Sequence, residues 1–165
     1  MRKVKFLIFV IIFITGGLYE SNAQVITGGS VGINYSNGLY LDASPIVGYR
    51  QGIIDVGIAP FFSYRDHENR DARYSFGNRV FAEVTLMKNV FIHGEFEMTN
   101  IETNVIDAAG DKERKWIYGL PVGAGYRHSI GKKTQAYVMV LYDVMLDDDS
   151  PVENPIVRGG VVIRL

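Results

Sequence analysis

Residues 53–65 read IIDVGIAPFFSYR, and large apolar side chains alternate there with small, polar or charged ones. The apolar parity is Ile54, Val56, Ile58, Pro60, Phe62 and Tyr64, and the other parity is Asp55, Gly57, Ala59, Phe61, Ser63 and Arg65. A period of two is that of a β-strand, whose successive side chains point to opposite faces. Globular strands usually have about five or six residues, whereas a tilted strand that crosses a membrane needs ~9–11. The stretch therefore predicts a long strand with one apolar face.

The same alternation recurs along the rest of the chain. We predict eight strands, over residues 28–35, 39–50, 53–65, 74–87, 89–101, 115–128, 134–146 and 156–165. Short links follow residues 50, 87 and 128, and apart from 36–38 the other links are long and polar: 66–73, 102–114 and 147–155. Short turns at one end and longer loops at the other are typical of bacterial outer-membrane barrels. The expected fold is therefore all-β, an eight-stranded antiparallel up-and-down transmembrane β-barrel.

The orientation of the two faces follows from residue size. The polar face is rich in glycine, alanine and serine, which fit a narrow lumen, whereas the apolar face carries the large side chains. Apolar outside and polar inside is the pattern of a membrane barrel, in which closure of the sheet pairs every backbone group. A soluble lipocalin-like binder would have the opposite orientation. Segment 134–146 is apolar at both parities, which predicts either a locally dry lumen or a different register.

Aromatic residues gather near the predicted strand ends. Near the long links they are Tyr35, Tyr40, Tyr64, Tyr74, Trp116, Tyr118 and Tyr142; near the short turns they are Tyr49, Phe91 and Tyr126. Amphipathic rings at both water–lipid boundaries are expected of an interfacial girdle.

The N-terminus has the features of an export signal. Basic residues at positions 2, 3 and 5 precede nine apolar residues, Phe6 to Ile14, and Ser21-Asn22-Ala23 follows. We predict a cleaved signal peptide over residues 1–23, cut between Ala23 and Gln24, and a barrel domain over residues 24–165. Nine apolar residues are too few for a membrane-spanning helix, which needs about 20. The chain has no cysteine, so disulfides and thiolate sites are excluded.

The polar parity places many charged residues in the predicted lumen. They are Asp42, Arg50, Asp55, Arg65, Arg79, Glu83, His93, Glu95, Glu97, Arg127, Asp143, Arg158 and Arg164. Eight strands leave an interior that side chains can fill, and buried charges must be paired. We expect a charge-matched plug, with a narrow ion or proton path as the alternative. We predict no catalytic residue, cofactor or metal site: His93 beside Glu95 and Glu97 fits the lumen network, and adjacent His128 and Ser129 would point to opposite faces.

The signal peptide, the amphipathic strands with alternating link lengths and the ending Val161–Leu165 resemble the small outer-membrane β-barrels of the OmpA and OmpX type. The resemblance covers residues 24–165, without the peptidoglycan-binding domain of full OmpA-type proteins. Leu165 stands where that family usually has phenylalanine. The resemblance implies a monomer in the bacterial outer membrane, surrounded by lipid and lipopolysaccharide and inserted by the barrel-insertion machinery.

The expected function is a non-enzymatic structural or surface-interaction role. The alternatives are a narrow ion or small-solute channel and a lipid A-modifying barrel enzyme. A net charge of −1 gives no basic field for nucleic acid.

Overall fold

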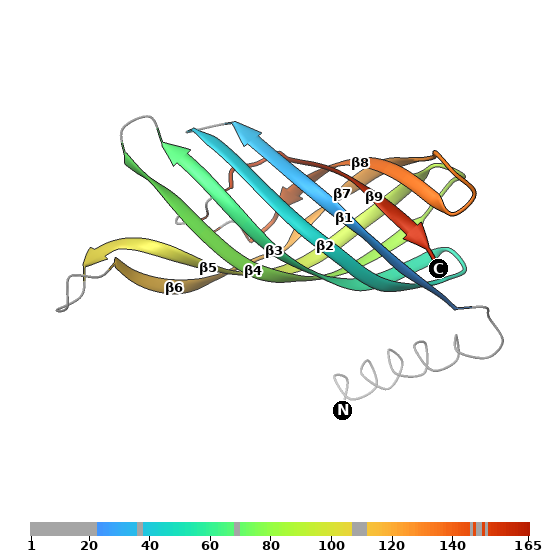
Figure 1. The fold of residues 1–165 in the computed structure, drawn as a ribbon, viewed down its shortest axis with the longest axis horizontal. Helices are drawn as coiled ribbons and strands as arrows, with labels where there is room; N and C mark the ends of the chain where they lie inside the picture. Colours follow the sequence, from blue (N-terminus) through green and yellow to red (C-terminus); the bar gives the residue numbers. More distant parts are fainter. Residues whose placement is uncertain are drawn as a thin grey trace, which may run out of the picture.

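The computed structural model describes residues 23–35, 38–67, 70–106, 112–145, 147, 150 and 152–165. These residues form a closed antiparallel β-barrel of eight strands in up-and-down order (Figure 1). Nine labels are used, because one strand of the barrel is divided into β6 and β7. The labelled strands are β1 (Gln24–Tyr35), β2 (Leu39–Gln51), β3 (Ile54–His67), β4 (Arg70–Thr85), β5 (Val90–Ile106), β6 (Lys112–Gly119), β7 (Pro121–Ser129), β8 (Thr134–Asp143) and β9 (Ile156–Arg164). β1 pairs with both β2 and β9, and the β4–β5 pairing completes the ring. Among the described residues, no helix is long and apolar enough to cross a membrane.

Two of the labelled strands are one strand of the barrel. β6 and β7 both pair with β5 and are separated only by Leu120. The interruption coincides with Pro121, which has no N–H to donate to a ladder. The single predicted strand over residues 115–128 is therefore present, with a break that the alternation did not indicate.

The other boundaries differ from prediction mainly by longer strands. The first strand begins at Gln24 instead of residue 28, the fourth at Arg70 instead of 74, and the fifth runs to Ile106 instead of 101. In each case the backbone ladder with a neighbouring strand continues beyond the residues whose alternation predicted the strand. The predicted signal peptide covers residues 1–23, of which residues 1–22 lie outside the described residues. Its cleavage after Ala23 therefore stays a prediction.

The predicted orientation of the faces is confirmed, including the doubtful segment in β8. Val138 and Val140 are 51% exposed on the outer wall, whereas Met139 and Leu141 are buried at 3% and 1%. Of the two alternatives left open for this segment, the structure therefore shows the locally dry lumen, because the inner face of β8 is apolar.

Two apolar clusters fill the lumen around this dry side. One contains Tyr40, Phe91, Met139, Leu141, Val152 and Ile156, and the other contains Ile46, Ala59 and Phe81. Tyr137 packs against both clusters. Glycines make room for the rings: a Cβ at Gly125 would lie 2.3 Å from Cζ of Phe91.

The predicted aromatic girdle is wrong at two positions. Tyr40 and Phe91 lie at the inner parity, together with Asp42 and His93, and are buried in the lumen. The other predicted rings are exposed or half-buried on the outer wall, where Tyr74 packs on Phe62 and Tyr64 at centroid distances of 5.7 and 5.4 Å. Closeness to a strand end predicted the height of these two rings but did not decide their face.

Candidate functional site

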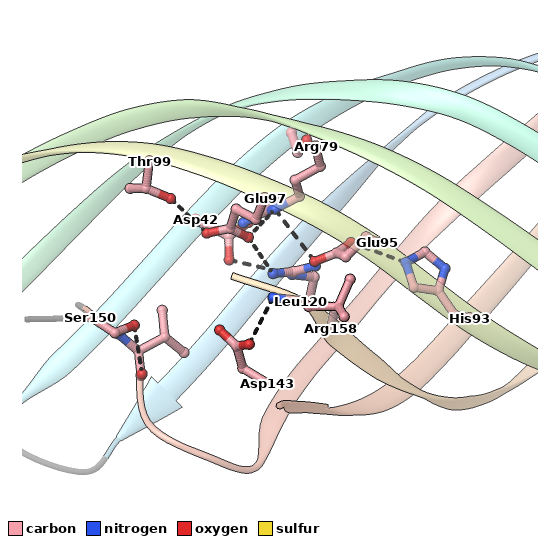
Figure 2. A network of polar contacts seen from close by, with 12 residues as sticks. Asp42, Arg79, His93, Glu95, Glu97, Thr99, Leu120, Asp143, Ser150 and Arg158 are labelled. Carbon is pink, nitrogen blue, oxygen red and sulfur yellow. Dashed lines mark hydrogen bonds and ion pairs between the residues drawn. The ribbon is translucent and has the colours of Figure 1, made fainter. Parts of the chain in front are cut away.

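The lumen contains a chain of charged side chains, and its centre lies between β2, β4, β5 and β9 (Figure 2). Arg79 Nη1 donates to Asp42 Oδ1 at 2.9 Å, and Arg79 Nε donates to Glu97 Oε2 at 2.7 Å. Arg158 Nη1 donates to Glu95 Oε1, and Arg158 Nη2 donates to Glu97 Oε2 at 3.3 Å. Two guanidinium groups and three carboxylates thus form one connected central cluster.

The central cluster is removed from water. Arg79 and Arg158 are 1% and 2% exposed, and the Arg79 guanidinium carbon lies 3.9 Å from the centroid of the Phe61 ring. An unpaired charge at such depth costs several kcal/mol, because its hydration is lost. The cluster is therefore stable only as a complete set of partners.

A second group of ion pairs lies toward the end of the barrel that carries the short turns, which we call the short-turn end. Arg127 pairs with Glu83 and, at 3.0 Å, with Asp55. Arg50 also pairs with Asp55, through Nε to Oδ1 at 2.5 Å and through Nη2, and its Nη1 donates to Gln135 Oε1 at 3.0 Å. Asp55 therefore links two arginines from β2 and β7.

His93 joins the two groups. Its Nδ1 lies 3.1 Å from Glu83 Oε1, its Nε2 lies 3.0 Å from Glu95 Oε2, and its ring stacks on Phe81 at a centroid distance of 5.6 Å. An ionised carboxylate only accepts hydrogen bonds, so both ring nitrogens donate when Glu83 and Glu95 are ionised. His93 is then a cation that bridges two carboxylates, and its ring has no nitrogen left to act as a base or a metal ligand.

Three of the predicted lumen charges do not join this network. Asp143 instead completes the backbone at the β6–β7 break: its Oδ1 accepts from Leu120 N at 2.8 Å and from Met145 N at 3.0 Å. Gly119 leaves space for the carboxylate, since a Cβ there would lie 2.5 Å from Asp143 Oδ2. Asp143 lies at the inner parity, as predicted. The prediction that it is a network charge is wrong, because its carboxylate accepts the backbone N–H of Leu120 at the strand break.

Arg65 and Arg164 lie beyond opposite ends of the network. Arg65 stands directly across from Arg73 in the β3–β4 ladder, near the long links, and Arg164 ends β9 at the short-turn end. Sequence reasoning missed Thr99 and Gln135, whose side chains bind Glu97 and Arg50. Their inner parity could have placed them in the lumen, but we selected lumen residues by charge, and these two side chains are neutral.

One small cavity lies inside the network. A cavity of about 20 Å³ lies among Ser30, Glu83, His93, Tyr137 and Arg158. One water needs about 10–15 Å³ on this measure, so the cavity has room for a single molecule. Chemically the arrangement is suited to filling and closing the barrel, with ion pairs on one side and apolar side chains on the other.

Comparison with known proteins supports this fold. No protein-family model matches the chain, and no curated protein matches it. Among solved structures it is similar to Neisserial surface protein A (NspA), with 13% identity, a TM-score of 0.50, and coverage of 88% of this chain and 98% of that one. It also matches the N-terminal β-barrel domain of Pseudomonas aeruginosa OprF, at 10% identity and a TM-score of 0.49, covering 87% of this chain and all of that one. At such low identity, the likeness to NspA shows the fold alone.

Proposed function

We propose that this chain is a non-enzymatic barrel of the bacterial outer membrane, with a structural or surface-interaction role and a lumen closed by its charge network. The observation that carries the proposal is the inversion of the usual arrangement: valine, isoleucine and phenylalanine cover the outside, while arginine and glutamate fill the inside. An apolar surface of this extent in water would promote aggregation. In a bilayer it is the face that lipid requires.

The outer wall also carries a polar group among its rings near the long links. Arg114 Nε donates to Asn100 Oδ1 at 2.5 Å, Arg114 Nη1 pairs with Glu102 at 2.8 Å, and the guanidinium lies 5.1 Å from the centroid of the Phe76 ring. Trp116 packs edge-on against the same ring at 6.2 Å. Charged and aromatic groups in one band suit the level of lipid headgroups. We therefore propose lipopolysaccharide as the partner of this rim, with the long links outside the cell.

The remaining parts of the proposal follow from the same orientation. Both ends of the barrel domain, Gln24 and Leu165, lie at the short-turn end, which would face the periplasm after export (Figure 1). The alternating final strand β9 would be read by the barrel-insertion machinery, and the barrel would remain a monomer. Ion pairs that span the lumen support a closed interior over a channel.

Three measurements test the proposal. The protein folded in detergent should migrate faster on a gel before boiling than after it, as expected of a stable membrane barrel; a protein that stays monodisperse in buffer without detergent would contradict the membrane location. Planar bilayers containing the folded protein should show no stepwise conductance. Steady conductance steps would favour the narrow channel, and a changed lipid A mass spectrum in a deletion strain would favour the enzyme.

A further inference from the structure

The short-turn end of the barrel is strongly basic. Its charged side chains are Arg50, Lys88, Arg127, Lys132, Lys133 and Arg164 on the basic side, and Asp55 and Glu83 on the acidic side. The three lysines lie in the turns between β4 and β5 and between β7 and β8, whereas the arginines are at the inner face of β2, β7 and β9. Such an excess of one sign around the mouth of a cavity attracts small ions of the opposite sign.

Both acidic side chains of this end already have basic partners. Asp55 Oδ1 accepts from Arg50, and Asp55 Oδ2 accepts from Arg50 and Arg127. Glu83 Oε1 faces His93, and Glu83 Oε2 accepts from Arg127. Both oxygens of each carboxylate therefore already have a partner, and a further cation at this end would have to share them.

Arg164 is that further cation. Its side chain interacts electrostatically with Arg50, Asp55 and Arg127, and the described residues offer its guanidinium no hydrogen bond or ion pair. Its Nε is buried and has no acceptor, and the Nε of neighbouring Arg127 is in the same condition. Two buried cationic donors without acceptors are costly unless a ligand supplies the acceptors.

The unsatisfied groups define the chemistry of that ligand. They are donors only and carry positive charge, so a metal cation does not fit and a negatively charged acceptor does. Carboxylate and phosphate oxygens match guanidinium donors in geometry and charge. Arg50 and Arg164 are half-buried, so the mouth is accessible.

We propose that Arg164 and Arg127 form an oxyanion site at the short-turn mouth of the lumen, which binds a carboxylate or a phosphate group. The site adds a binding function to the structural role proposed above. Its donors come from β7 and β9, which are separated along the wall by β8. A group bound there would connect the strands that flank β8 and would enter from the periplasm if the orientation proposed above holds.

The test follows the Nε–Hε signals of the arginine side chains by nuclear magnetic resonance, with the folded protein in detergent micelles. Inorganic phosphate and acetate are titrated separately at constant ionic strength, with chloride as the balancing ion. We expect saturable shifts of the Arg164 and Arg127 signals. A response to phosphate alone identifies a phosphate ligand, a response to acetate alone identifies a carboxylate ligand, and a response to both supports the common oxyanion chemistry. If neither phosphate nor acetate causes a saturable shift, the proposal is overturned.

Two variants control for position and folding. Arg164→Gln should weaken anion binding about tenfold or more, since it removes a charged donor. Arg65→Gln changes the same residue type at the opposite mouth and should leave binding unchanged. Equal loss in both variants overturns the site. The gel shift on heating verifies that each variant is folded, and Arg164→Lys, which keeps the charge, should retain part of the binding.

Discussion

The centre of the lumen and its short-turn end contain the same chemistry in different surroundings. In the centre, Arg79 and Arg158 are fully buried, and each lies within 4 Å of the same three carboxylates. At the short-turn end, Arg50 and Arg164 are half-buried, and Arg164 has no ion pair among the described residues. Both arginines of the centre are enclosed and have ion-pair partners, although Arg79 Nη2, Arg158 Nε and Asp42 Oδ2 make no hydrogen bond. Arg164 is partly exposed and lacks such partners, which is the basis of the anion site proposed above. The following predictions test this difference, from the largest effect to the smallest.

The largest effect is expected in the centre. Arg158→Ala leaves Glu95 and Glu97 without one of their cations in a dry interior, and should lower the free energy of unfolding by about 3–5 kcal/mol. Denaturant unfolding in lipid vesicles measures the loss. A loss below about 1 kcal/mol would show that water reaches the cluster and that the plug is loose.

The dry side of the lumen should be nearly as sensitive. Leu141→Ala removes a buried side chain and should cost about 2–5 kcal/mol, because the lost contacts leave a cavity in the apolar cluster. Its neighbour Val140 faces outward, and Val140→Ala in the same vesicles should cost less than half as much. Similar losses for both variants would contradict the assigned faces of β8.

The connection between the two regions should show a smaller effect. His93→Gln replaces a cation with a neutral side chain between Glu83 and Glu95, and we expect a loss of about 1.5–3 kcal/mol at neutral pH. In a double-mutant cycle, His93→Gln and Glu83→Gln should couple by about 0.5–3 kcal/mol. Additive losses would mean that the imidazole and the carboxylate do not interact.

The smallest effect is expected at the short-turn end. Arg50→Ala should cost only about 1 kcal/mol, because Asp55 keeps its pair with Arg127 and is not left as an unpaired buried charge. The same unfolding assay compares it with Arg158→Ala. If the two variants lose the same stability, the contrast between centre and end does not exist.

The sequence predicted which face each strand presents, because alternation is a local property of neighbouring residues. It placed Arg79, Glu95 and Arg158 inside, but it could not pair them: Arg158 and Glu95 are 63 residues apart, and only closure of the barrel brings them together. The backbone role of Asp143 depends on the break at Leu120, which alternation does not reveal. Tyr40 and Phe91 were assigned by height, although their parity alone would have placed them inside.

The central claim is an outer wall in lipid around a closed lumen, and a cysteine scan of β8 tests it most directly. The chain has no cysteine, so single-cysteine variants at residues 138–141 carry the only thiol of each protein. In lipid vesicles, cysteines at 138 and 140 should react with a lipid-soluble maleimide, and cysteines at 139 and 141 should react with neither this reagent nor a charged, water-soluble one. Rapid reaction of positions 139 and 141 with the water-soluble reagent would show an open, hydrated lumen and contradict the account.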